Sequence, residues 1–427
     1  CAFMGAYVEK NLRAVKGLKL MPLYDTEAGK QDRERLADPV AVRDALRELG
    51  RQQELEPQSL EDILKNGELL IEPSDENSKD EEIYEADDVC SIIGFPMLLQ
   101  HVLRLFLLRQ HRDDISKILD KELLQIFQTH WLDGLAQCEK SVQTNEVRSF
   151  IDLLWRCRYL FDKHVIKRLT DEKEENLGIR RLRVNDQSLI RDSQNVESGF
   201  TMLQSMLYHS QQLTTHYWLT PLLNYLLDHG GKNAHHYLKY LDNHLLCSDS
   251  EQPLIERTRE FVRNPWSEAY PLRDMQSVLT ANDGTSFAHY WFYKLEYILW
   301  ERYCNQKDDK WRAFRMTARN SVEHVSPQNP EFDDSKTVDH EHLDCFGNLG
   351  LVSRSINSEF GNKAYIKKRV HFWERNKNRV DSLKLALIYE HEHWNSELAL
   401  AHQSQMIAEF QTYFDEVENA ADCQNRS

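Results

Sequence analysis

The stretch "SVEHVSPQNP" (residues 321–330) decides how the C-terminal part of the chain is interpreted, because it sets a carboxylate beside a histidine. Pro327 and Pro330 stop a helix just beyond that pair. We therefore predict a short strand that ends at Glu323 and His324. The pair alone fits two interpretations, an ordinary surface contact or the first half of a metal-dependent site. The residues that follow are needed to distinguish them.

The second half of the pattern lies in "DCFGNLGLVSRSINSEFGNKAYIKKR" (residues 344–369). Asn348 opens an apolar run that predicts a second strand. Ser353 or Ser355 can then cap a helix that carries Asn357. The predicted order is strand, loop, strand, helix, and Asn357 follows Asn348 by nine residues. That order and that spacing are typical of ββα-metal nucleases.

The residue types suit hydrolysis of a phosphodiester bond with a divalent cation. Glu323 and the side-chain carbonyl of Asn357 are oxygen ligands for a hard cation, Mg²⁺ or Mn²⁺. His324 is predicted to stay unligated, so that its neutral imidazole takes a proton from the attacking water. The cation would polarise the phosphate and stabilise the departing 3′-oxygen, and Asn348 would brace the backbone that aims His324. The alternative is a capped helix beside a partly buried, hydrogen-bonded histidine.

Basic residues gather directly after the predicted helix. Residues 363–379 contain seven lysines and arginines, opposed by Glu374 alone. Because the whole chain carries a net charge of −16, any contact with DNA has to be local. A solvated helix face is the alternative. The predicted contacts to the phosphate backbone come from Lys363, Lys367, Lys368 and Arg369.

The rest of the chain predicts a mainly α protein, in which a helical N-terminal and middle region precedes the ββα-metal domain. Glycine and proline are scarce, 15 and 11 in 427 residues, and apolar residues recur every three or four positions. Residues 73–88 hold eight acidic side chains against one lysine, which predicts a solvated loop or an acidic strip that binds a partner. The predicted helices span residues 95–110, 147–169, 199–210, 220–230, 287–304 and 381–416.

No membrane or export segment is evident. No stretch reaches the roughly 18 consecutive apolar residues of a bilayer span, and the N-terminus lacks the layout of a secretory signal. The eight cysteines include no Cys-x-x-Cys pair, so zinc knuckles are not expected. We expect a cytoplasmic protein with reduced thiols and no membrane partner.

The phrases "ARNSVEHVSPQNP" and "FGNLGLVSRSINSEFGNK" resemble the C-terminal His-Asn-His-type nuclease domain of the GmrSD family, the modification-dependent (type IV) restriction endonucleases. "HYWFYKLEYILWE", "RYLFDKHVIKR" and "LQSMLYHS" resemble the helices before that domain. The resemblance implies a metal-dependent endodeoxyribonuclease that defends against foreign or modified DNA, including phage DNA. It places Glu323 and His324 at the acidic-histidine position, Asn348 at the middle asparagine, and Asn357 where many relatives have histidine.

The resemblance also implies a domain order. Residues 1–90 would be the remnant of a ParB-like domain, 91–283 a helical connecting domain, and 284–427 the nuclease domain. The family's Asp-Gly-Gln-Gln-Arg box is absent, so a nucleotide is expected as a cofactor only if an upstream ParB-like domain or subunit is supplied. Because the chain begins at Cys1, we expect that part to be removed or encoded separately. The rival function is a non-catalytic helical interaction or DNA-holding protein that retains the nuclease fold.

Overall fold

Four of the predicted helices begin and end close to where the apolar pattern places them. Pro96 occupies the first turn of α6 (Phe95–Arg109), a position where its missing N–H costs nothing. α11 (Leu219–His229) ends at Gly230, whose φ of 60° suits glycine. α10 (Gly199–Ser210) and α15 (His289–Tyr303) also match their predicted ranges. The computed structural model describes residues 89–112, 115–171, 174–185, 188–195, 198–210, 215–329 and 337–425.

The protein is mainly helical, as predicted. The expected acidic segment 73–88, and the expected ParB-like remnant up to residue 88, lie outside the described residues. Within the described ranges, no helix is both long and apolar enough to cross a bilayer. The further helices are α7 (Leu123–Phe127), α8 (Asp133–Ala136), α12 (Ala234–Leu246), α13 (Leu254–Arg263), α14 (Met275–Leu279), α16 (Asp309–Arg312), α17 (Arg354–Phe360) and α18 (Tyr365–Arg375), with short turns η2 (Asp120–Glu122), η3 (Gln128–Leu132), η4 (Gly284–Ser286), η5 (His340–His342) and η6 (Phe346–Asn348).

The helix predicted over 147–169 is wrong at both ends, since it begins seven residues earlier and ends five residues earlier than predicted. α9 spans Lys140–His164, and the chain then becomes extended at Val165. The next residues form β2 (Lys167–Asp171), which lies between β1 (Val89–Ser91) and β3 (Glu174–Gly178) in an antiparallel sheet. Pairing with a strand far back in the sequence overrides local helix propensity here. A second hairpin follows, β4 (Arg180–Asn185) with β5 (Ser188–Asn195).

The single helix predicted over 381–416 is two helices. α19 spans Leu383–Tyr389 and α20 spans Ser396–Asn425. The Asn395 side chain accepts a hydrogen bond from the backbone N–H of Leu398 at 3.0 Å, which starts the second helix. Trp394, 1 % exposed, anchors the connection between them.

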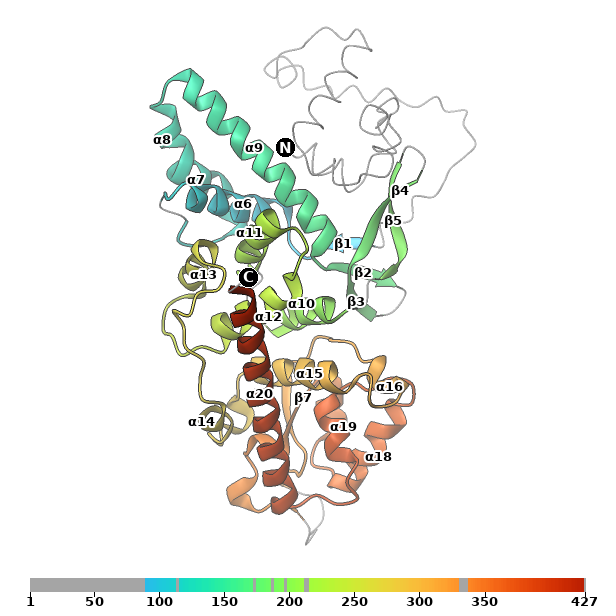
Figure 1. The fold of residues 1–427 in the computed structure, drawn as a ribbon. Helices are drawn as coiled ribbons and strands as arrows, with labels where there is room; N and C mark the ends of the chain where they lie inside the picture. The colour runs from blue at the N-terminus through green and yellow to red at the C-terminus, as the bar shows by residue number, and fades with distance from the viewer. Residues whose placement is uncertain are drawn as a thin grey trace, which may run out of the picture.

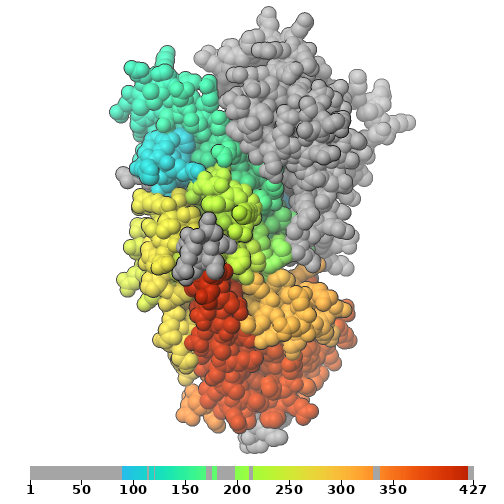
Figure 2. Space-filling view, in the orientation of Figure 1, coloured from blue at the N-terminus to red at the C-terminus, as the bar shows by residue number. Residues whose placement is uncertain are grey.

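Figure 1 shows α6–α9 and strands β1–β5 at one end of the molecule and the C-terminal elements at the other. α20 runs from the C-terminal end towards the middle and packs against α12, α14, α15 and η6. In the space-filling view it lies along the visible face between the yellow and orange parts of the chain (Figure 2). This helix therefore joins the middle region to the C-terminal elements.

Two glycines allow the C-terminal elements to approach closely. A Cβ on Gly347 would lie 1.9 Å from the backbone oxygen of Ala399 in α20. A Cβ on Gly350 would lie 2.5 Å from Cδ2 of Leu385 in α19. All four residues of β7 (Leu349–Val352) are buried. A larger residue at position 347 would push η6 away from α20, and one at position 350 would push β7 away from α19.

Candidate active site

The two predicted strands form and pair. β6 (Ser321–His324) lies antiparallel to β7, with Glu323 opposite Gly350 and His324 opposite Leu349. α17 follows β7 directly, and the Ser353 hydroxyl caps it by accepting from the N–H of Ile356 at 3.4 Å. The element order is strand, loop, strand, helix, as the sequence predicts.

Successive strand residues point to opposite faces, and the contacts of the central pair follow this rule. The Nε2 atom of His324 lies 2.8 Å from Oδ1 of Asp344, in the loop before η6. The histidine is 8 % exposed, whereas the carboxylate of Asp344 is half open to solvent. A carboxylate at Nε2 favours the tautomer with its proton there and leaves Nδ1 as the basic nitrogen.

Glu323 faces α18. Its Oε1 atom lies 2.5 Å from Nζ of Lys368, and the same ammonium donates to the backbone oxygen of His324 at 2.7 Å. Burial raises the pKa of the Glu323 carboxyl, while the neighbouring Lys368 opposes that shift. Burial also lowers the pKa of Lys368, against the pull of Glu323. The two groups thus form a buried ion pair on the strand that carries His324.

This pair corrects one expected DNA contact. The Lys368 side chain is fully buried and committed to Glu323 and His324, so it does not reach a phosphate at the surface. Lys367 is exposed and Lys363 is half-buried. Arg369 is half-buried and donates from Nε to the backbone oxygen of Tyr389 at 2.8 Å. Lys363 and Lys367 therefore remain the more accessible of the four predicted contacts.

Asn348 is completely buried, and its amide joins three segments. Its Oδ1 accepts from the N–H of Ser326 at 2.9 Å and from the indole N–H of Trp394 at 3.1 Å. Its Nδ2 donates to the backbone oxygen of Leu343 at 2.8 Å. Ser326 lies two residues beyond His324 and Leu343 lies directly before Asp344, so this amide links the two segments that carry the His324–Asp344 contact.

Asn357 lies half-buried on α17, a helix that packs beside β6. Among the described residues, no hydrogen bond joins its amide to Glu323. Likewise, no three His, Cys, Asp or Glu side chains gather as a metal site within the described ranges. The donor set that fits a cation is one carboxylate and one amide oxygen, both hard ligands. The buried charge of Glu323 requires a cationic partner, and Lys368 supplies it.

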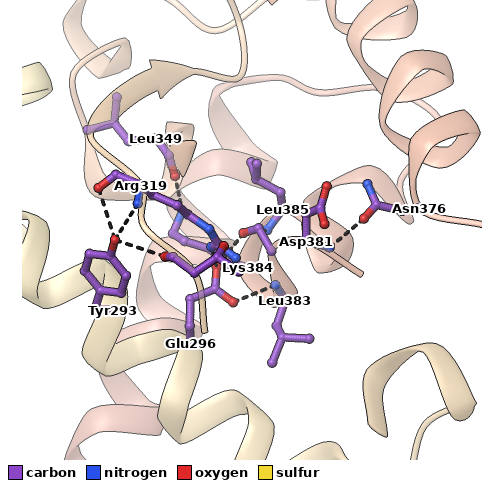
Figure 3. A network of polar contacts seen from close by, with 11 residues as sticks. Tyr293, Glu296, Arg319, Leu349, Asn376, Asp381, Leu383, Lys384 and Leu385 are labelled. Atoms are coloured by element: carbon purple, nitrogen blue, oxygen red, sulfur yellow. Dashed lines mark hydrogen bonds and ion pairs between the residues drawn. The ribbon is translucent and has the colours of Figure 1, made fainter. Parts of the chain in front are cut away.

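A network of polar contacts behind the strands supports them (Figure 3). The buried ammonium of Lys384 donates to the backbone oxygens of Phe346 at 2.9 Å and Leu349 at 2.5 Å, on either side of Asn348. Burial lowers the pKa of Lys384 to about 7. Glu296 of α15 pairs with Arg319 at 3.2 Å and accepts from the N–H of Leu383 at 2.6 Å. α15 and α19 thereby hold the segments that enter β6 and β7.

Sequence reasoning missed three of these side chains: Asp344, Lys368 in its supporting role, and Lys384. For Lys368 a signal was present, because it shares a helical stripe with the buried Tyr365 and Phe372, at spacings of three and four residues. A lysine on the apolar face of a helix is expected to be buried, and therefore to have an acidic side chain as its partner. Asp344 stands at no fixed spacing from His324, so only the folded loop reveals it.

Comparison with known proteins adds one finding about this part of the chain. Residues 273–409 match the family described as GmrSD restriction endonucleases, C-terminal domain. Comparison with curated proteins and with solved structures gives no significant match. The match covers β6, β7, α17 and α18, so it contains every residue of the site described above. Residues 273–409 are thus similar to the C-terminal domain of GmrSD restriction endonucleases.

Proposed function

We propose that the chain is a divalent-metal-dependent endonuclease that hydrolyses DNA phosphodiester bonds, in defence against foreign or modified DNA. The family match supports a restriction endonuclease role. The observation that carries the chemistry is the pairing of β6 with β7, which sets Glu323 and His324 at the end of one strand, each with a charged partner. A DNA substrate places this activity in the cytoplasm.

His324 is the general base in this proposal. Asp344 accepts from Nε2–H at 2.8 Å, so Nδ1 keeps the lone pair that takes a proton from the attacking water. Asn348 holds the chain at Ser326 and Leu343, which limits the motion of the histidine. Asp344 and Asn348 are therefore positioning residues.

Glu323 and Asn357 are the proposed ligands of Mg²⁺ or Mn²⁺. When bound there, the cation supplies charge that polarises the scissile phosphate and stabilises the departing 3′-oxygen. Lys368 keeps Glu323 ionised before a cation arrives, because its ammonium offsets the cost of burying the carboxylate. Lys363, Lys367 and Arg369 are the proposed DNA contacts, and a nucleotide acts only through an upstream ParB-like domain or subunit.

Plasmid nicking tests the proposal. Purified chain is incubated with supercoiled plasmid and Mg²⁺ or Mn²⁺, with and without an upstream ParB-like protein and nucleoside triphosphates. The wild-type chain is expected to nick the plasmid, and His324→Ala to abolish nicking while circular dichroism shows an unchanged fold. His340→Ala, an exposed histidine in the same domain, is the matched control and keeps full activity. Equal activity of His324→Ala and wild type would refute the assignment, and no nicking in any mixture would favour the non-catalytic reading.

A further inference from the structure

A cavity of about 450 Å³ lies between the middle region and the C-terminal domain. Its lining residues come from β3 and α10, from the end of α15, from α16, from residues 313–316 and from Arg379. Figure 1 shows where α10, α15 and α16 lie in the molecule. Cavities of roughly 300–1,000 Å³ hold small ligands or single residues of a polymer. Residues 313–316 continue directly towards β6, but the cavity lining contains none of the proposed catalytic residues.

The charge of the lining selects the ligand class. Three guanidinium groups contribute, those of Arg312, Arg315 and Arg379. Among the described lining residues, Asp309 alone carries a carboxylate, and it lies 3.0 Å from Arg312. Positive groups thus outnumber negative ones here, in a chain whose net charge is −16. Planar guanidinium groups pair with phosphate through two parallel hydrogen bonds, so this local excess favours a phosphorylated ligand.

The remaining lining adds an apolar and aromatic surface. The half-buried Trp300 provides an aromatic ring and the half-buried Met202 a flexible apolar contact, whereas Phe314 and Met316, 2 % and 4 % exposed, support this wall from the core. Aromatic faces stack on nucleobases of any sequence, and methionine adapts to irregular shapes. Ser198, Thr201 and Ser205 line the opposite wall, where the hydroxyl groups of Ser198 and Thr201 lie 3.2 Å apart and that of Ser205 donates to the backbone oxygen of Thr201 at 2.9 Å. An anion alone would not need the apolar half of this cavity.

We propose that this cavity binds a nucleotide, with its phosphate on the arginines and its base against Trp300. A free mononucleotide and a nucleotide within a DNA strand share this chemistry. The site is separate from Glu323 and His324, and its test needs binding but no cleavage. The endonuclease activity and the nucleotide-binding site can therefore be refuted independently of each other.

Binding to the full chain is measured in EDTA with two kinds of probe. AMP, ATP and inorganic phosphate are titrated by calorimetry, and a labelled single-stranded oligonucleotide is followed by fluorescence anisotropy. Arg315→Ala removes an exposed guanidinium and is expected to weaken nucleotide affinity about tenfold, as loss of a charged hydrogen-bonded pair does. Arg263→Ala, an exposed arginine outside the cavity, is the matched control and leaves affinity unchanged.

A second variant tests the base contact. Trp300→Leu is expected to weaken AMP or oligonucleotide binding about tenfold, with thermal unfolding run in parallel to confirm the fold. Loss of AMP and ATP affinity in both variants identifies a free nucleotide, whereas loss of oligonucleotide affinity alone identifies a nucleotide of the DNA strand. The proposal fails if Arg315→Ala leaves the affinity of every probe unchanged, or if Trp300→Leu does so. It also fails if AMP binds no tighter than inorganic phosphate while the affinity for the oligonucleotide is unchanged by Arg315→Ala.

Discussion

Replacing Lys368 by methionine removes the cation of the buried pair and keeps a side chain of similar length. The Lys368 side chain is 0 % exposed and that of Glu323 is 13 % exposed, so the carboxylate is left with little water and no partner. Removing one member of a buried ion pair costs roughly 3–5 kcal/mol. Because Glu323 keeps some solvent contact, we expect a loss near the lower limit, ~3 kcal/mol of unfolding free energy at neutral pH.

The loss has a predicted pH dependence. Burial already raises the pKa of Glu323, and Lys368 is the largest opposing influence, so the variant raises it further. A carboxyl with a raised pKa in the folded state favours folding while it is protonated, and that contribution disappears as pH rises through the folded pKa. The deficit of Lys368→Met relative to wild type should therefore be smallest in mild acid and grow towards neutral pH.

Urea unfolding at several pH values between 5 and 8 measures this deficit. A second substitution, Glu323→Gln, removes the uncompensated charge, and ~2 kcal/mol of the loss should return in the Lys368→Met background. The reasoning is refuted if Lys368→Met loses less than ~1 kcal/mol, or if its loss is the same with glutamine at position 323. Either result would mean that the pair is as weak as an ordinary surface contact.

Three further outcomes are expected. Asp344→Asn should lower the nicking rate about 10²-fold, by loosening the control of the His324 tautomer, while DNA affinity in EDTA stays constant; an unchanged rate would exclude Asp344 from the mechanism. Asn348→Ala should lower the unfolding free energy by ~2–4 kcal/mol in urea, because its buried backbone and indole partners lose their hydrogen bonds, and a loss within error would remove its bracing role. In the His324→Ala background, Mg²⁺ at a hundredfold excess over its Kd should stabilise the fold by ~2.7 kcal/mol; an equal response after Glu323→Gln would exclude that carboxylate as a ligand.

The local patterns predicted much of this architecture. The apolar run after Asn348 and the serine beyond it predicted β7 and α17 in their observed order. Periodicity likewise predicted α6, α10, α11 and α15. These elements could be predicted because each is specified by residues a few positions apart in the sequence.

The missed features depend on residues far apart in the sequence. β2 forms because Lys167–Asp171 pairs with strands on both sides, one of which begins at Val89. The partner of His324 lies 20 residues away in a loop, and the partner of Glu323 lies 45 residues away on a helix. The sequence shows which side chains are charged or can form hydrogen bonds, but it does not show which distant residue each one will pair with.

The close packing of Gly347 against the backbone of α20 couples the movement of η6 to that of the helix. That helix also packs against α12 of the middle region, and a helix of 30 residues behaves as a stiff rod. Gly347 has no side chain that could change its conformation at this contact. If α20 tilts at its contact with α12, we therefore expect η6 and the adjacent Asn348 to move with it. The position of Asn348 therefore depends on the orientation of α20, and through α20 on that of the middle region.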